Sequence, residues 1–227
     1  MKKLSVIIPT FNEQNTITRI ISRVKKLKLK KISKEIIVVD DGSTDGSVNK
    51  IKQLKNIKTV FQPVNQGKGA AIRAGLKKAT GDYILIQDAD LEYDPQDIPS
   101  LLEPVLTGKA EIVYGSRFLG PHKNMLFWHL MGNKFLSLLT NILYNTTLSD
   151  MEVGYKLIPA ELIKSLNLQQ NRFGFEPEVT CKLLKQGHRI FEVPVSYAGR
   201  EFHEGKKITW KDGLKAFFIL FKYRFSD

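Results

Sequence analysis

Short apolar runs alternate with amphipathic segments through the first half of the chain, and this alternation limits the possible folds more than any other feature. Five apolar runs are predicted strands, at residues 4–9, 35–40, 57–61, 83–87 and 112–115. Four of them precede segments with apolar residues at helical spacing, at 16–29, 46–54, 67–79 and 95–106. The pattern predicts an α/β fold in which helices sandwich a mostly parallel sheet.

A pair of carboxylates follows the predicted strand at 83–87. In sheets of this kind, ligands gather at the carboxyl ends of the strands. Asp88 and Asp90 stand at such an end, and hard oxygen ligands two residues apart suit Mg2+ or Mn2+. Burying two like charges together is costly unless a cation lies between them. A solvated turn is the alternative, because many loops contain so short a pattern.

Two other strand ends carry polar motifs. At the first, Pro9 ends the strand, the Phe11 ring can flank a base, and Glu13 can accept hydrogen bonds from a base or a ribose. At the second, Asp41 precedes Gly42, a residue type that lets the backbone approach a ligand closely. A helix cap and an Asx-turn would use the same residues, so both interpretations stay open for each motif.

In this order and spacing, the motifs resemble those of the family 2 inverting glycosyltransferases. These enzymes have the GT-A fold, a Rossmann-like fold that binds nucleotide sugars. The resemblance covers about residues 4–224 and is greatest to the polyprenyl-phosphate sugar synthases, the subgroup that includes dolichyl-phosphate mannosyltransferase. The segments that carry it are residues 65–71, 79–83, 115–117, 149–157 and 192–195.

The resemblance implies a set of residues that bind a nucleotide-diphosphate sugar. The nucleoside would contact Pro9, Phe11, Glu13, Val39 and Asp41. Ala89 would lie against the nucleotide, and Arg200 and Lys206 would belong to a basic loop that closes over the donor. Phe11 stands where the family often has tyrosine, which keeps ring stacking and removes a hydroxyl contact.

The resemblance also implies a metal site and an acceptor site. Asp88, Asp90 and Glu92 would hold Mg2+ or Mn2+, with Glu92 standing where the family commonly has glutamine. Arg117 would contact an acceptor phosphate, although a surface ion pair is the alternative. Asp150 would have a structural or acceptor-side role, so Asp90, Arg117 and Asp150 are the predicted catalytic residues. The second arginine that the family often carries is missing between residues 117 and 172.

The implied reaction is transfer of a hexose, with inversion, to a polyprenyl or dolichyl phosphate. A phosphate monoester is largely a dianion at neutral pH, because its second pKa is near 6, so the nucleophile hardly needs a base. GDP-mannose is the first choice of donor, ahead of UDP-glucose or a UDP-N-acetylhexosamine. A soluble glycan acceptor is an alternative within the enzyme class. A non-catalytic nucleotide-sugar-binding protein is the alternative from another class.

The charge balance points to anionic partners. The 35 Lys and Arg residues exceed the 23 Asp and Glu residues, for a net charge of +12. Such an excess favours nucleic acid, acidic membrane surfaces or phosphorylated substrates. Nucleic acid binding would leave the acidic motifs at the strand ends unexplained, so we expect no nucleic acid partner. The histidines show no metal-ligand spacing and receive no catalytic role.

Two apolar segments predict contact with lipid. Residues 125–144 carry apolar side chains at helical spacing, although a core helix would show the same pattern. Aromatic and basic residues are interleaved near the end of the chain, which predicts an amphipathic, interfacial C-terminal helix at 209–227. The resemblance implies a GT-A domain at 1–208. No run approaches the roughly 18 to 20 apolar residues of a spanning helix. We therefore expect a cytoplasmic protein bound peripherally to the cytoplasmic face of a membrane, with a small membrane-protein partner as one option.

The single cysteine, Cys181, excludes an intramolecular disulfide and fits a reducing compartment. It is predicted to be a small core residue.

Overall fold

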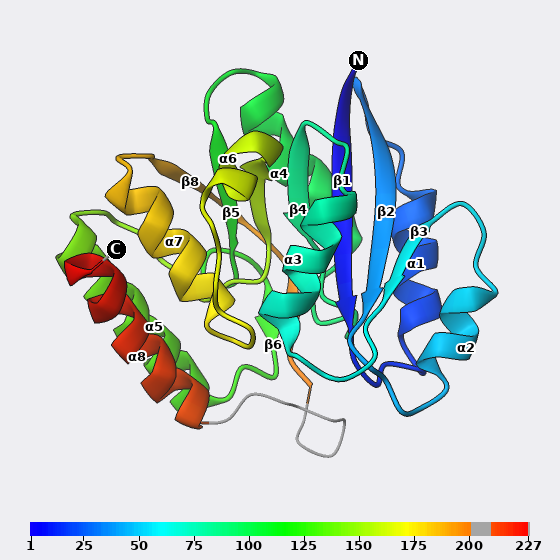
Figure 1. The fold of residues 1–227 in the computed structure, drawn as a ribbon. Coiled ribbons are helices and arrows are strands. Elements are labelled where there is room, and N and C mark those ends of the chain that lie inside the picture. The colour runs from blue at the N-terminus through cyan, green and yellow to red at the C-terminus, as the bar shows by residue number, and fades with distance from the viewer. Residues whose placement is uncertain (201–209, 227) are drawn as a thin grey trace.

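A computed structural model describes residues 1–200 and 210–226 (Figure 1). Within these ranges a seven-stranded sheet has the order β3-β2-β1-β4-β7-β5-β8. All its neighbouring strands are parallel except β7, which runs antiparallel to β4 and β5. The strands are β1 (Lys2–Thr10), β2 (Ile32–Asp40), β3 (Lys58–Phe61), β4 (Tyr83–Ile86), β5 (Ile112–Ser116), β7 (Lys156–Pro159) and β8 (Ile190–Pro194).

Helices flank the sheet, and a small parallel ribbon of β6 (His122–Lys123) and β9 (Tyr197–Ala198) lies near the carboxyl ends of its strands (Figure 1). The helices are α1 (Ile17–Lys26), α2 (Ser47–Lys52), α3 (Lys68–Lys78), the 3-10 turn η1 (Pro95–Asp97), α4 (Ile98–Leu106), α5 (Phe127–Tyr144), α6 (Ala160–Ser165), α7 (Phe175–Lys185) and α8 (Trp210–Phe225). The predicted mostly parallel sheet between helices is therefore confirmed.

The core lies on both faces of the central strands. In β1, Leu4, Val6, Ile7 and Ile8 are completely buried, as expected for a strand that helices cover on two sides. This burial on both faces explains why the strands read as continuous apolar runs in the sequence. The four-residue strand β7 was not predicted, because so short a run has no clear periodicity.

A second, smaller core joins α5, α7 and α8, which lie side by side in Figure 1. Its buried residues include Leu136 of α5, Cys181 of α7 and Leu220 of α8. The prediction that Cys181 is a core residue is confirmed. The C-terminal helix is present, and one face of it packs against the rest of the protein.

The opposite faces of α5 and α8 expose large apolar side chains. They are Phe127, Trp128, Phe135, Leu138 and Ile142 on α5, and Leu214, Phe218 and Phe225 on α8. The core interpretation of residues 125–144 is confirmed for one side of α5. The other side is exposed, and its contact with lipid stays a prediction. None of the helices in the described ranges combines the length and apolar character that crossing a bilayer requires.

Candidate active site

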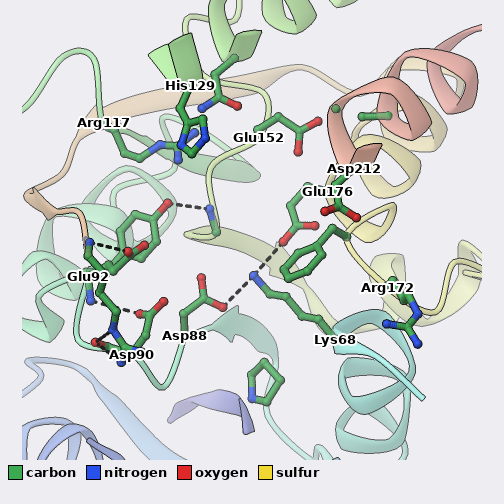
Figure 2. Close-up of a pocket in the computed structure, with 18 of the residues that line it drawn as sticks. Lys68, Asp88, Asp90, Glu92, Arg117, His129, Glu152, Arg172, Glu176 and Asp212 are labelled. Atoms are coloured by element: carbon green, nitrogen blue, oxygen red, sulfur yellow. Dashed lines mark hydrogen bonds and ion pairs between the residues drawn. The ribbon is translucent and has the colours of Figure 1, made fainter. Parts of the chain in front are cut away.

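A cavity of about 1000 Å³ opens where the parallel strands end (Figure 2). Most of the site residues predicted from the sequence line it together: Pro9, Phe11, Glu13, Asp41, Asp88, Ala89, Asp90, Glu92, Arg117 and Arg200. Val39 is buried inside β2, and Asp150 is buried behind Arg117, so neither lines the cavity. Lys206 lies outside the described residues.

The Asp41 carboxylate organises the loop at one end of the cavity. Its two oxygens accept hydrogen bonds from the backbone N–H groups of Gln66 and Gly67, at 2.9 and 2.7 Å. Gly67 has a φ of 102°, and a side-chain carbon there would lie 2.4 Å from the carbonyl oxygen of Asn171. Glycine is therefore required at this position. Asp41 holds the loop that leads into α3 against the cavity.

Glu13 and Arg200 form an ion pair across the same end. The Arg200 guanidinium donates to both Glu13 oxygens, at 3.2 and 2.8 Å. It also donates through Nε and Nη2 to the carbonyl oxygen of Asp90, at 3.0 and 2.6 Å. Arg200 thereby links the segment after β9 to the ends of β1 and β4. The sequence alone does not predict this pair, because its members are 187 residues apart.

Acidic side chains and one lysine form the centre of the cavity (Figure 2). The Lys68 ammonium lies 2.7 Å from Oδ1 of Asp88 and 2.8 Å from Oε1 of Glu176. The pKa of Lys68 is raised, because these two carboxylates outweigh the cost of burying the charge. The pKa of Asp90 is raised to about 8, chiefly by burial and then by the nearby charges of Glu92 and Asp88.

The residues around Asp88 and Asp90 suit a divalent cation. The pKa of Asp90 is raised by burial and by neighbouring negative charges that protein cations compensate only in part, and a metal ion would offset both effects. Mg2+ often uses one or two carboxylates and takes its other ligands from substrate phosphates and water. No group of three or more His, Cys, Asp or Glu side chains within the described part of the chain is arranged to hold a metal. Two carboxylates plus a diphosphate fit both observations.

Glu92 has other partners in this structure. Its Oε1 accepts from the backbone N–H of Arg200 at 2.8 Å, and its Oε2 accepts from the Tyr197 hydroxyl at 2.9 Å. The carboxylate fastens the segment around β9 to the loop after β4. Its role as a metal ligand stays a prediction.

Arg117, directly after β5, forms a buried bidentate pair with Asp150. Nε and Nη2 of the arginine lie 2.7 and 2.6 Å from the two carboxylate oxygens. Asp150 is held in turn by a backbone hydrogen bond to Glu192 of β8, at 3.1 Å. Arg117 is 8% exposed, so the pair is not the surface ion pair considered as an alternative. The aspartate fixes the guanidinium at the wall of the cavity.

Three cavity residues that the sequence analysis did not assign are Lys68, Glu152 and Glu176. The pKa of Glu152 is raised to about 8, mainly by burial and then by the charge of Glu176. Lys68 and Glu152 lie in segments 65–71 and 149–157, which carry the family resemblance, whereas Glu176 lies outside all such segments. His129 also lines the cavity.

An apolar wall closes the other end of the cavity. It consists of residues from α5, α8 and the segment before α5: Met125, Leu126, Trp128, Phe135, Leu214 and Phe217. Trp128 and Leu214 are also exposed at the molecular surface. One cavity therefore contains the acidic side chains, Arg117 and an apolar wall that continues onto the exposed faces of α5 and α8.

Comparison with known proteins identifies the family. Residues 5–166 match the model of glycosyl transferase family 2. The chain belongs to this family, and the resemblance found in the sequence is confirmed.

Among curated relatives, a dolichol-phosphate mannosyltransferase of Pyrococcus furiosus is 29% identical over 211 residues, 90% of this chain. The chain spans only 59% of that protein's length. A hexosyltransferase of low-salt glycan biosynthesis from Haloferax volcanii is 30% identical over 202 residues, which are 87% of this chain and 48% of the relative.

The fold is also that of known glycosyltransferase structures. Glucosyl-3-phosphoglycerate synthase from Mycobacterium tuberculosis, solved with Mn2+, UDP and glucosyl-3-phosphoglycerate, superimposes with a TM-score of 0.77 at 22% identity. The match covers all of this chain and 81% of the synthase. The predicted GT-A fold is confirmed.

Proposed function

We propose that this protein transfers a hexose from a nucleotide-diphosphate sugar to a polyprenyl phosphate at a membrane surface. One observation carries the proposal: a single cavity joins the carboxylates of Asp88 and Asp90, the buried guanidinium of Arg117 and an apolar wall from α5 and α8. A lipid phosphate combines an anionic head with a hydrocarbon chain, so it needs a cation and an apolar surface side by side. The name of the Pyrococcus furiosus relative supports the same acceptor class.

On the donor side, Asp88 and Asp90 would hold Mg2+ or Mn2+. The bound ion would stabilise the negative charge that develops on the leaving nucleoside diphosphate. Structures of the similar mycobacterial synthase that contain UDP with Mn2+ or Mg2+ support a divalent ion. Lys68, held between Asp88 and Glu176, adds a fixed positive charge beside the same position.

On the acceptor side, Arg117 would bind and orient the attacking phosphate. Arginine suits this task because its planar fork matches a pair of phosphate oxygens. Asp150 holds the guanidinium in place, so little conformational freedom is lost when the acceptor binds. The phosphate oxygen would displace the nucleoside diphosphate directly, which inverts the configuration at the anomeric carbon. Catalysis would then consist mainly of aligning two anions that repel each other.

The donor is proposed to be GDP-mannose, with UDP-glucose or a UDP-N-acetylhexosamine as alternatives. The mannosyltransferase named above supports the first choice. The structure of the mycobacterial synthase with UDP-glucose supports considering uridine donors. Few protein contacts distinguish one donor from another, so all three donors should be compared in one experiment.

The proposed location is peripheral, on the cytoplasmic face of a membrane. The exposed apolar side chains of α5 and α8 support this location. Lys215 and Lys222 are exposed on α8 as well, and basic residues beside apolar ones suit the headgroup layer of a membrane. Nothing in the described residues points to the predicted small membrane-protein partner.

The direct test measures transfer of radiolabelled sugar to a short polyprenyl phosphate in lipid vesicles. GDP-mannose, UDP-glucose and UDP-N-acetylglucosamine are compared with Mg2+, Mn2+ or EDTA. Asp90→Ala is the site variant, and Glu103→Gln on the exposed side of α4 is the control. We expect a lipid-linked product that requires metal, is lost in Asp90→Ala and persists in Glu103→Gln.

Two other outcomes would redirect the assignment. If sugar is transferred to a soluble glycan and no lipid product forms, the acceptor is a glycan and not a polyprenyl phosphate. Nucleotide-sugar binding without transfer to any acceptor would favour the non-catalytic alternative.

A further inference from the structure

We infer that Glu152 and Glu176 form the subsite that holds the transferred hexose, and that they accept hydrogen bonds from its hydroxyl groups. The inference rests on the proposed function, because it takes the ligand to be a nucleotide-diphosphate hexose. It adds two residues to the site and gives them a task in sugar recognition.

Glu152 and Glu176 each have a buried oxygen that makes no hydrogen bond within the described part of the chain. Glu176 is 4% exposed, and its Oε1 accepts from Lys68, whereas its buried Oε2 has no partner among the described residues. Oε1 of Glu152 is likewise buried and without a partner in the described part of the chain. A buried polar group without a hydrogen bond destabilises the protein, and more so when it is charged. Because both residues line the cavity, a ligand can satisfy these oxygens.

Glu152 and Glu176 line the same cavity as the residues proposed to hold the two reacting groups. Glu176, on the first turn of α7, is joined through Lys68 to Asp88, where the leaving diphosphate is proposed to lie. Glu152 is two residues from Asp150, which holds Arg117 at the proposed acceptor site. Figure 2 shows both carboxylates on one side of the cavity, with Arg117 on the opposite side. In a direct displacement, the transferred sugar lies between the diphosphate and the acceptor phosphate, so these carboxylates would flank it.

The oxygens of Glu152 and Glu176 are chemically complementary to the hydroxyl groups of a hexose. Carboxylate oxygens accept hydrogen bonds, and each free hydroxyl of a hexose can donate one. Phosphates lack donors when ionised, so the acceptor oxygens of these acids suit the hydroxyl groups of the sugar that lies between the two phosphate groups.

A structural alternative is that Glu152 and Glu176 balance the charge of the buried Lys156, since both carboxylates act electrostatically on its ammonium. The hydrogen bond of that ammonium goes to the carbonyl oxygen of Met151, at 2.7 Å, and it lies 3.8 Å from the centre of the Tyr114 ring. Among the described residues the charges of Lys156 and Glu152 therefore interact without a direct ion pair. The experiment therefore separates sugar recognition from charge balance.

The test compares calorimetric binding of the nucleoside diphosphate with binding of the corresponding nucleotide hexose, both with Mn2+. The ratio of the two dissociation constants measures what the hexose adds. In Glu152→Gln, we expect the nucleoside diphosphate affinity to stay within about twofold while this ratio falls at least about fivefold, since the amide keeps only one of the two acceptor oxygens. Glu176→Gln should lower the ratio too, and the exposed Glu103→Gln is the control.

Deoxy analogues of the donor identify the contacts. Removing a hydroxyl that Glu152 binds should weaken binding to the wild-type protein. The same removal should cause little further loss in Glu152→Gln, because the substitution has already removed the same interaction. The structural alternative predicts instead that the analogue and the substitution act independently.

Several results would overturn the inference. One is an unchanged ratio in a folded Glu152→Gln, and another is an equal loss of affinity for nucleotide and nucleotide sugar. If the variants do not fold, a wild-type protein that tolerates every deoxy analogue overturns it as well. Failure of the proposed function looks different: the hexose still strengthens binding, but no sugar reaches a polyprenyl phosphate.

Discussion

At the scale of single residues, Gly154 gives Asp88 the space it occupies. A side-chain carbon at position 154 would lie 2.5 Å from Oδ2 of Asp88 and 3.2 Å from the Tyr93 ring. Gly154→Ala should therefore displace the Asp88 carboxylate and raise the Mn2+ concentration for half-maximal transfer about tenfold or more, the equivalent of about 1.4 kcal/mol. A metal titration of sugar transfer measures this. An unchanged titration in a folded variant would argue against Asp88 as a ligand.

Asp90 should make stability depend on pH. Its pKa is raised to about 8 in the folded protein, whereas an unfolded aspartate has a pKa near about 4. Between these values the folded state binds a proton that the unfolded state has lost, so this group lowers the free energy of unfolding as pH rises from about 4 to 8. Without metal, the free energy of unfolding, measured with urea, should fall less steeply between pH 5 and 8 in Asp90→Asn than in the wild type. Parallel curves for the two proteins would contradict the raised pKa.

The Arg117–Asp150 pair should matter for stability as well as for acceptor binding. Asp150→Asn leaves a buried guanidinium without its counter-charge, which costs about 3 to 5 kcal/mol in comparable buried pairs. The exposed pair of His188 and Glu111 is the matched control, since Glu111→Gln should change stability by less than about 1 kcal/mol. Denaturant unfolding of both variants decides the matter. If both variants lose less than about 1 kcal/mol of unfolding free energy, the buried pair contributes no more to stability than the exposed one.

At the scale of elements, the exposed apolar faces of α5 and α8 are predicted to bind membrane. Trp128 and Phe218 are 80% and 62% exposed, so replacing both with aspartate should leave thermal stability nearly unchanged. Vesicle sedimentation should show at least about a tenfold loss of binding, because two large apolar groups no longer enter the lipid. Val64→Asp, at an exposed apolar residue outside both helices, is the control. Undiminished binding of the double variant would place the membrane contact elsewhere.

At the scale of the whole molecule, ligand binding should stabilise the fold. A nucleoside diphosphate at about 100 times its Kd adds about 2.7 kcal/mol to the free energy of unfolding. For a chain of this size, that raises Tm by about 5 to 10 °C. Thermal scans should show the shift with Mn2+ and its loss with EDTA or in Asp88→Asn. A shift of equal size in EDTA would show that the nucleotide binds without metal.

Much of the first half of the molecule could be predicted from the sequence. Strand β1 reads as an apolar run because helices cover both its faces, and the same holds for β2 and β4. Since parallel strands end at the same edge of a sheet, Glu13, Asp41 and Asp88 were expected to lie together, and they line one cavity. The second half was harder, because β7 is short and runs against its neighbours.

The sequence by itself determined the family, the parallel half of the sheet and the acidic residues at its strand ends, because periodicity and motif spacing are local properties of the chain. Only the tertiary structure decided which charges meet. Arg117 pairs with Asp150 across 33 residues, and Arg200 reaches Glu13 across 187. It also decided that Lys68, Glu152 and Glu176 share the cavity with Asp88. Such contacts depend on how distant elements pack, and no spacing along the chain encodes them.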